Sequence, residues 1–243
     1  MSLQLVTGHQ SRVAAAVPFA AEKQDLSSLF DAQPVERFTP AAAVFWEGDQ
    51  ARHIFEVVEG TLRAVRILND GRRVIIGFLR PGDLLGVSVK EHYLYTVEAI
   101  THVELRRFSR RRFESESARA PHLREQLFSR LCDEMAAAQD QMVLLSRRSA
   151  EEKVAGFLLM MARGQSENRR PVIELPMTRL DVADYLGMTI ETVSRTITKL
   201  AGSGVIAIVG RHAIAILKMD ALIALADGEC DDGAQRSARY AKA

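Results

Sequence analysis

Hydrophobic and polar residues alternate with a period of two in short runs between residues 43 and 108. Glycine, aspartate and asparagine separate the runs, most clearly at Asn69-Asp70-Gly71 and Pro81-Gly82-Asp83. This period places side chains on alternate faces of a strand, and these separators suit tight hairpin turns. The pattern predicts an all-β roll or barrel, preceded by one short helix over Leu26–Phe30. The predicted strands are Ala43–Trp46, Ile54–Val58, Thr61–Ile67, Arg73–Leu79, Tyr93–Ile100 and Val103–Phe108.

After Pro121 the hydrophobic period changes from two to that of a helix. Apolar side chains recur at alternating steps of three and four residues, which is a heptad seam. Polar residues flank the seam, so it is narrow enough to lie between two long helices and predicts a homodimer. A helix packed on its own domain is the alternative, because a seam this short does not prove a dimer. The seam consists of Phe128, Leu131, Met135, Ala138, Met142 and Leu145.

A further helical segment begins at Ser149. Ser149 and Glu152 have the spacing of a capping box, and Gly164 is the expected end of the helix. A polar loop over residues 165–170 and a short strand over Val172–Leu175 come next. A domain boundary is therefore expected near Arg147-Arg148. The apolar face of the helix is Val154, Phe157, Leu158 and Met161.

Residues 178–200 predict two short helices joined by a tight turn. Thr178 is the expected N-cap of the first helix, Gly187 lies in the turn and Thr189 is the expected N-cap of the second. Such a pair is a helix-turn-helix, whose second helix enters the major groove of DNA. The expected apolar faces are Leu180, Val182, Ala183 and Leu186 in the first helix, and Ile190, Val193, Ile197 and Leu200 in the second.

The polar face of the second helix carries side chains that suit base recognition. Glu191 can accept a hydrogen bond from cytosine N4, and Arg195 can donate two parallel hydrogen bonds to guanine O6 and N7. Because these residues are four apart, a solvated ion pair along the helix is the alternative. The next segment favours DNA, because it predicts a hairpin wing whose Arg211 and His212 contact phosphate. The strands of this hairpin are Val205–Val209 and Ala213–Leu217.

Residues 181–200, D-V-A-D-Y-L-G-M-T-I-E-T-V-S-R-T-I-T-K-L, strongly resemble the winged helix-turn-helix of the CRP/FNR family of bacterial transcription regulators. E-T-V-S-R is the family's recognition motif, the preceding P-M-T-R also matches, and the resemblance extends from about Leu26 to Asp227. It implies a DNA-binding homodimer, mainly an activator, on FNR-type inverted repeats, with Glu191, Ser194 and Arg195 reading bases. The residues that it implies at the DNA backbone are Thr178, Thr189, Thr192, Lys199, Arg211 and His212.

The resemblance also implies an α+β architecture. A cyclic-nucleotide-binding-type β-roll (a double-stranded β-helix) precedes a long dimerisation helix and a C-terminal winged helix-turn-helix. The expected division is a disordered extension 1–25, roll 26–118, dimerisation helix 119–147, DNA-binding domain 148–228 and flexible tail 229–243. A roll hairpin of FNR-like activators contacts RNA polymerase, and a turn selected only for its backbone is the alternative. The matching hairpin tip is Asn69, Asp70, Gly71 and Arg72.

The roll lacks the ligand motifs of the family's known sensors. Cyclic-nucleotide-binding members hold the cyclic phosphate with an arginine after a G-E-[LI] turn, whereas no arginine lies between Arg80 and Arg106 here. Oxygen-sensing FNR proteins need a cysteine cluster, and residues 1–131 contain no cysteine. No cofactor is therefore expected, and the chain resembles the FixK-like branch, which implies a low-oxygen cascade. A haem-dependent gas sensor with His53, His92 or His102 as ligand is the alternative.

Composition narrows the remaining classes of protein. The chain has 243 residues, 32 Lys+Arg and 31 Asp+Glu, a net charge of +1, so DNA binding must come from a local patch. Cys132 and Cys230 are too few for a disulfide framework, and Cys132 is expected to be a buried structural thiol. No apolar run reaches the roughly 18 residues of a membrane span, and no HExxH or GxSxG motif indicates an enzyme. We therefore expect a cytoplasmic DNA-binding protein without a membrane partner.

Overall fold

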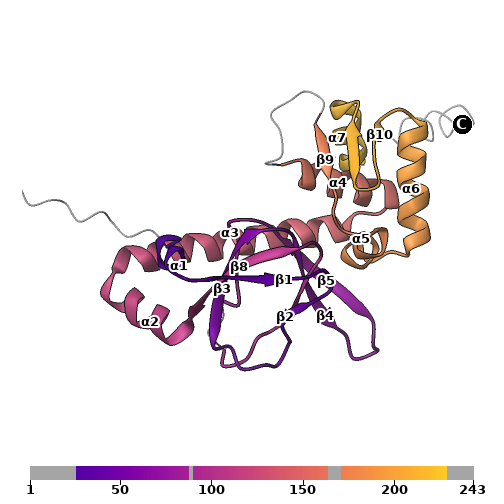
Figure 1. Ribbon diagram of the computed structural model, residues 1–243. Helices are drawn as coiled ribbons and strands as arrows, with labels where there is room; N and C mark the ends of the chain where they lie inside the picture. The colour runs from indigo at the N-terminus through magenta and orange to yellow at the C-terminus, as the bar shows by residue number, and fades with distance from the viewer. Residues whose placement is uncertain (1–25, 88–89, 164–170, 229–243) are drawn as a thin grey trace, which may run out of the picture.

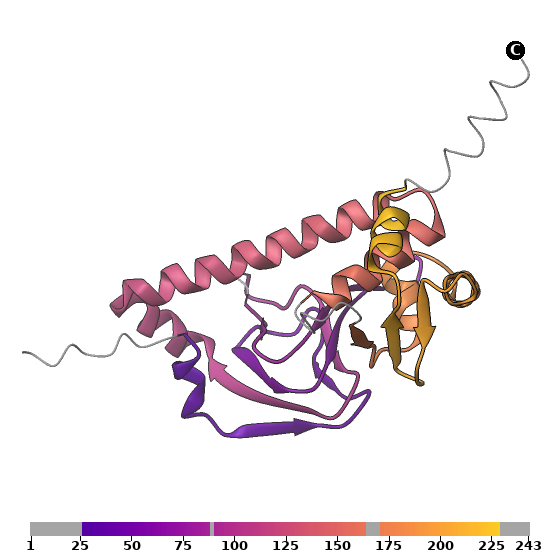
Figure 2. The ribbon, with the colours of Figure 1, turned by 90° about the horizontal axis from the view of Figure 1, so that it is seen from above.

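The computed structural model describes residues 26–87, 90–163 and 171–228. A β-roll and a smaller C-terminal domain lie next to each other, and a long helix extends from one to the other (Figure 1). Figure 2 shows this helix, α3 (Pro121–Ser146), along one side of the roll, from α2 (Arg110–Arg119) to the C-terminal domain. The expectations for residues 1–25, Gly164, 165–170 and 229–243, with Cys230, lie outside the described residues.

Two four-stranded antiparallel sheets form the roll, in the orders β1-β8-β3-β6 and β2-β7-β4-β5. Leu62, Leu85 and Leu105 are fully buried between them, because the inward positions of the alternating strands are apolar. The predicted β-roll is confirmed. The strands are β1 (Val35–Phe38), β2 (Ala43–Phe45), β3 (His53–Glu59), β4 (Leu62–Ile67), β5 (Arg73–Leu79), β6 (Leu84–Leu85), β7 (Thr96–Ala99) and β8 (Val103–Ser109).

The strand predicted over Tyr93–Ile100 is too long, because β7 begins only at Thr96. Tyr93 is held differently: its ring stacks on Phe45 at 3.8 Å between centroids, and its backbone N–H donates to the Asp49 carbonyl at 2.9 Å. This segment therefore closes a loop beside the sheet. Strands β1 and β6 were not predicted, whereas β5 has the predicted bounds.

Helix α3 packs on both domains, but not through its heptad seam. Its buried residues are Leu123, near the roll and α1 (Ser28–Asp31), and Leu144, in the core of the C-terminal domain. On the seam, the exposed fractions are 68% for Phe128, 59% for Met135 and 62% for Met142. The seam is thus an apolar surface that the chain itself does not cover.

The burial predicted for Cys132 on α3 stays a prediction, because the single chain lacks the second helix that would cover the seam. The sequence suggests a buried structural thiol, but Cys132 is only half-buried in the single chain. Its side chain lies off the face that carries Leu123 and Leu144, which explains why the roll does not cover it.

The C-terminal domain consists of four helices and a three-stranded sheet of order β10-β11-β9. Phe157, Leu186 and Leu200 are fully buried in its core. The predicted helix-turn-helix and hairpin are present, while α2 and α7 were not predicted. The elements are α4 (Ala150–Ala162), β9 (Val172–Glu174), α5 (Arg179–Leu186), α6 (Ile190–Gly202), β10 (Ile206–Ile208), β11 (Ala213–Ile216) and α7 (Met219–Asp227).

Two residues assigned to the apolar faces of the helix-turn-helix lie outside the core. Leu180 is 48% exposed and Ile190 is 38% exposed. Each stands in the first turn of its helix, beyond the end of the packed core. The other predicted face residues are buried: Val182, Ala183, Leu186, Val193, Ile197 and Leu200.

Candidate nucleic-acid interface

Local capping fixes where the two helices of the helix-turn-helix begin. Thr178 caps α5 in a reciprocal capping box with Asp181, and Thr189 accepts a hydrogen bond from the Thr192 N–H at 3.3 Å to cap α6. Between them Gly187 adopts a left-handed conformation with φ of +63°, which a residue with a Cβ rarely adopts. The predicted caps and turn are confirmed.

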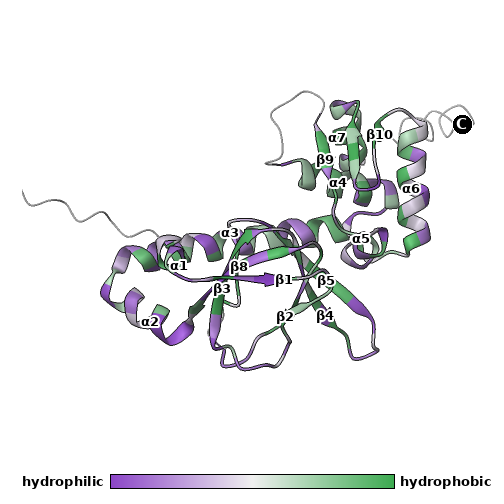
Figure 3. Cartoon of the chain, viewed as in Figure 1, coloured by the Kyte–Doolittle hydropathy of each residue, from purple (hydrophilic) through white to green (hydrophobic). Residues whose placement is uncertain are grey.

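Helix α6 separates an apolar face from a polar face. Val193, Ile197 and Leu200 are buried against the domain, while Glu191, Ser194 and Arg195 are exposed together on the other side. This mixture of hydrophobic and hydrophilic residues along α6 is visible in Figure 3. The candidate base-reading side chains therefore share one open face.

Glu191 is available as a charged acceptor. A hydrogen bond from its own backbone N–H and one from the Thr189 hydroxyl, together with the charge of Arg195, hold the pKa of Glu191 below its usual value. Among the ion pairs of the described residues, Glu191 and Arg195 do not form one within 4.0 Å. The direct ion pair along the helix is therefore not seen, and neither side chain is neutralised by the other.

The candidate backbone-contacting residues form two groups around α6. The hydroxyls of Thr189 and Thr192 lie 3.0 Å apart at its first turn. Thr178, Arg211 and His212 line a second location, a cavity of about 220 Å³ between the start of α5 and the wing. The His212 Nδ1 lies 3.2 Å from the Leu175 carbonyl, and Arg211 is exposed at the tip of the wing.

Arg179 lines the same cavity and was missed as a site residue, although it is part of the P-M-T-R motif. Burial lowers its pKa. No carboxylate of the described residues pairs with it within 4.0 Å. A partly desolvated, unneutralised guanidinium beside Arg211 favours an anion at this position.

Lys199 is committed elsewhere in this structure. Its ammonium forms an exposed ion pair with Glu151 of α4. A phosphate contact from Lys199 would have to compete with that carboxylate.

The hairpin proposed to contact polymerase is exposed between β4 and β5. The Asp70 carboxylate accepts hydrogen bonds from the Arg72 backbone N–H at 3.1 Å and from Arg72 Nε at 2.7 Å. Gly71 has a φ of +81°, which the turn requires. Asp70 therefore has a local structural role as a turn residue, which supports the alternative for this residue.

The turn that leads into β6 holds Gly82-Asp83-Leu84, where cyclic-nucleotide-binding rolls have their G-E-[LI] turn. Burial raises the pKa of Asp83, whose carboxylate accepts a hydrogen bond from the Arg80 N–H at 2.8 Å. Burial and the charge of Glu134 raise the pKa of Tyr95 to about 12. Two guanidiniums lie nearby. That of Arg80 contacts the Met161 sulfur, and that of Arg130 donates to the Gly82 carbonyl. The turn therefore presents a carboxylate, and the sequence after it contributes no arginine before Arg106, so the arginine that holds the cyclic phosphate in cyclic-nucleotide-binding rolls has no counterpart here.

The three candidate haem ligands are separate surface features. His92 and His102 are exposed, and His53 is half-buried beside Phe55. Burial lowers the pKa of His53. In the described part of the chain, no group of three or more His, Cys, Asp or Glu residues is placed to hold a metal ion. None of the helices described is both long enough and apolar enough to span a bilayer.

Comparison with known families decides the class of protein. A model of the Crp-like helix-turn-helix domain matches residues 152–225, and a model of the cyclic nucleotide-binding domain matches residues 35–119. The chain belongs to the CRP/FNR family of transcription regulators. It is therefore a DNA-binding regulator of a family that does not consist of enzymes.

Individual CRP/FNR relatives confirm the predicted FixK-like character. The chain is 42% identical over 178 residues to the nitrogen fixation regulation protein FixK of Bradyrhizobium diazoefficiens, covering 71% of this chain and 73% of that protein. It is 33% identical over 224 residues to the transcriptional activator protein FnrL of Cereibacter sphaeroides, covering 90% of each. The structure of FixK2 from Bradyrhizobium japonicum superposes with a TM-score of 0.75 at 32% identity, covering 79% of this chain and 96% of that one.

Proposed function

We propose that this CRP/FNR regulator is a homodimeric activator that reads an inverted repeat resembling TTGAT–ATCAA. The observation that carries the proposal is the exposed face of α6, where Glu191, Ser194 and Arg195 lie together opposite a buried apolar face. Two copies of such a helix, related by a two-fold axis, match the symmetry of an inverted repeat.

Each base-reading side chain has a role that follows from its hydrogen-bonding groups. Arg195 donates two parallel hydrogen bonds to guanine O6 and N7. Ionised Glu191 accepts from the N4 amino group of the cytosine opposite a guanine, and Ser194 contacts the neighbouring thymine. Thr189, Thr192, Arg211 and His212, joined by Arg179, hold phosphates and so set the register on the duplex. Thr178 contacts phosphate only if its cap opens, because its N–H and its hydroxyl both donate to Asp181. Lys199 contacts phosphate only if its pair with Glu151 opens.

The heptad seam of α3 supplies the dimer contact. Phe128, Met135 and Met142 are large apolar side chains, each more than half exposed in the single chain. Together with Leu131, Ala138 and Leu145 they form one continuous stripe, which a second α3 covers in a parallel coiled coil.

The regulator binds DNA without a small-molecule effector, and its amount is set by a low-oxygen cascade. The carboxylate-lined end of the roll supports the first part of this proposal, and the likeness to FixK supports the second. It acts in the cytoplasm on promoter DNA and contacts RNA polymerase through the exposed hairpin at Asn69–Arg72, in which Asp70 holds the turn by its bonds to Arg72.

Footprinting of the aerobically purified chain tests the proposal. We expect protection of a TTGAT–ATCAA repeat at two chains per site, at protein concentrations where a scrambled repeat of the same composition is unprotected, both at one fixed salt concentration. Equal affinity for the two sequences would contradict the proposal. A Soret band in the purified protein would instead favour the haem-dependent sensor.

A further inference from the structure

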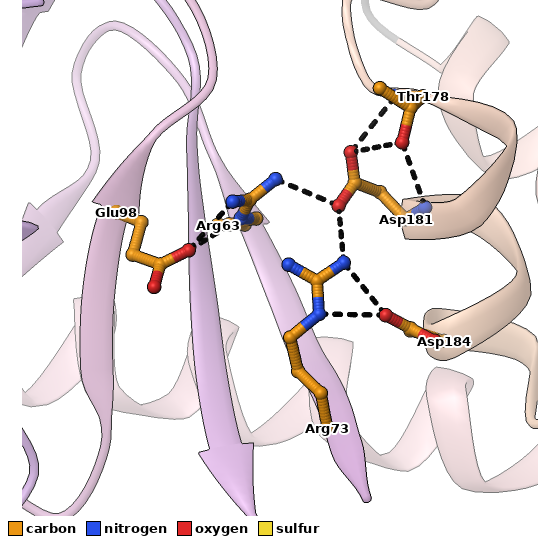
Figure 4. A network of polar contacts seen from close by, with 6 residues as sticks. All are labelled: Arg63, Arg73, Glu98, Thr178, Asp181 and Asp184. Carbon is orange, nitrogen blue, oxygen red and sulfur yellow. Dashed lines mark hydrogen bonds and ion pairs between the residues drawn. The ribbon is translucent and has the colours of Figure 1, made fainter. Parts of the chain in front are cut away.

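A buried carboxylate joins the β-roll to the helix-turn-helix. Asp181 of α5 is 1% exposed, and its two carboxylate oxygens accept hydrogen bonds from different partners. One oxygen accepts from the Thr178 N–H at 2.9 Å and the Thr178 hydroxyl at 2.7 Å, which caps α5. The other accepts from Arg63 at 2.8 Å and Arg73 at 2.9 Å, and both of these arginines belong to the roll (Figure 4).

The two arginines extend the network across the sheet. Arg63 of β4 also donates to Glu98 of β7 at 2.7 Å, and Arg73 of β5 also pairs with Asp184, which lies three residues beyond Asp181 on α5. Both arginines are thus held from two sides, and α5 is fastened at two points. Rotation of α5 about its axis would break one of these pairs.

The charges of the network are mutually satisfied. Burial alone would raise the pKa of Asp181, but the hydrogen bonds from Thr178 and the charges of Arg63 and Arg73 outweigh it, so the pKa is lowered. Burial opposes the charge of Arg73, but Asp184 and Asp181 outweigh it and raise the pKa of Arg73. The network therefore stays ionised near neutral pH.

An apolar contact lies next to the network. The ring of Phe78 on β5 packs against Tyr185 of α5 at 5.2 Å and Phe157 of α4 at 6.4 Å. Val65 and Ile75 of the roll belong to the same hydrophobic core as the C-terminal domain. The domain contact therefore combines close packing with directed ion pairs.

The orientation of α5 determines the position of the recognition helix. The turn at Gly187 and the shared core join α6 rigidly to α5, and the end of α3 packs on the same core through Leu144. In a dimer, the distance between the two α6 helices must match the spacing of two half-sites. A small tilt of α5 on the roll would change that distance.

We infer that Asp181, Arg63 and Arg73 form a positioning site, which fixes the recognition helix on the roll and so sets the half-site spacing that the dimer accepts. This inference rests on the proposed binding of an inverted repeat. A purely structural role is the alternative, because a buried ion pair also contributes to folding. The two roles differ in how DNA affinity depends on spacing.

The test measures affinity for repeats whose half-sites are separated by the preferred spacing, or by one base pair less, one more and two more. The variants are Arg63→Ala and Asp184→Asn. The second leaves every hydrogen bond of the buried Asp181 in place, and so keeps the test valid if the first does not fold. Arg66→Ala is the matched control, because Arg66 lies on β4 but pairs with Glu47 of the roll at 3.1 Å.

Affinity of both variants for the preferred spacing should fall about tenfold, in the range of substitutions that alter coupling between parts of a protein. Their affinity for the other spacings should fall less, so that the difference in affinity between the preferred spacing and the others becomes smaller. Arg66→Ala should keep the wild-type difference. Folded variants with the wild-type spacing preference would overturn the inference. Failure of the wild-type chain itself to prefer any repeat would instead overturn the proposed function.

Discussion

Replacing Met135 by aspartate perturbs the centre of the seam on α3. Met135 is 59% exposed in the single chain, so more than half of its side chain is available for burial in a dimer. Full burial of such a side chain is worth about 1.5–3 kcal/mol, which gives roughly 1–2 kcal/mol for the available part and twice that for two chains. The two introduced carboxylates would also face each other across the dimer axis, at a cost of several kcal/mol more.

The sum is about 4 kcal/mol or more, which corresponds to a dimer Kd at least roughly a thousandfold higher. Sedimentation equilibrium across a range of protein concentrations measures this change, and a gel shift with the repeat is run on the same samples. We expect Met135→Asp to be a folded monomer that has lost operator binding. The matched control is Asp133→Lys, which changes the charge of an exposed polar position on the same helix and should remain dimeric.

Two results would refute this reasoning. A Met135→Asp chain that sediments as a dimer would remove the seam from the interface. A monomeric variant that binds the full repeat as tightly as the wild type would show that the dimer is not needed for recognition.

Three other predictions concern the hairpin, the interdomain carboxylate and the roll. Because Asp70 is bonded to Arg72 within its own turn, Asp70→Ala should lower the thermal midpoint modestly and leave transcription per bound dimer unchanged; in vitro transcription at saturating occupancy would show a loss of activation if the residue contacts polymerase. The folded pKa of Asp181 lies below its unfolded value of about 3.9, so its contribution to stability is complete above that pH and is lost as the pH falls through the folded pKa. The free energy of unfolding, measured with urea, should therefore fall less steeply from pH 5 to pH 2.5 in Asp181→Asn than in the wild type. Equal pH dependence in the two proteins would count against the network. Because no arginine lies between Arg80 and Arg106 to hold a cyclic phosphate, cyclic AMP should leave operator affinity unchanged in a fluorescence anisotropy titration, and a shift greater than twofold would show that the roll binds it.

Periodicity predicts the parts of the fold that have strongly alternating or helical patterns. Strand β5 has the predicted bounds, and Thr178, Gly187 and Thr189 occupy the predicted caps and turn. Helix α2 was missed because its sequence, R-R-R-F-E-S-E-S-A-R, has almost no apolar face to detect. Strand β6 was missed because two residues are too few to show a period.

In the candidate site, too, features formed by residues close in sequence are predicted and features formed by distant residues are not. The base-reading face of α6 is local, so the sequence predicts it. The network around Asp181 is not local, because its partners Arg63 and Arg73 lie 118 and 108 residues away in the chain. A capping box explains Asp181 completely at the level of sequence, and only the packing of the roll on α5 shows its second role. Leu180 and Ile190 were misassigned because periodicity does not indicate where the core ends.

The central claim is that α6 reads the operator through Glu191, Ser194 and Arg195. The most direct measurement compares Arg195→Ala with the wild type against repeats in which the contacted guanine is replaced by each other base, at one fixed salt concentration. We expect affinity for the natural repeat to fall by about 1–3 kcal/mol and preference to be lost at that base pair alone, with the other positions still discriminated. Unchanged affinity and unchanged base preference in a folded, dimeric Arg195→Ala would contradict the account.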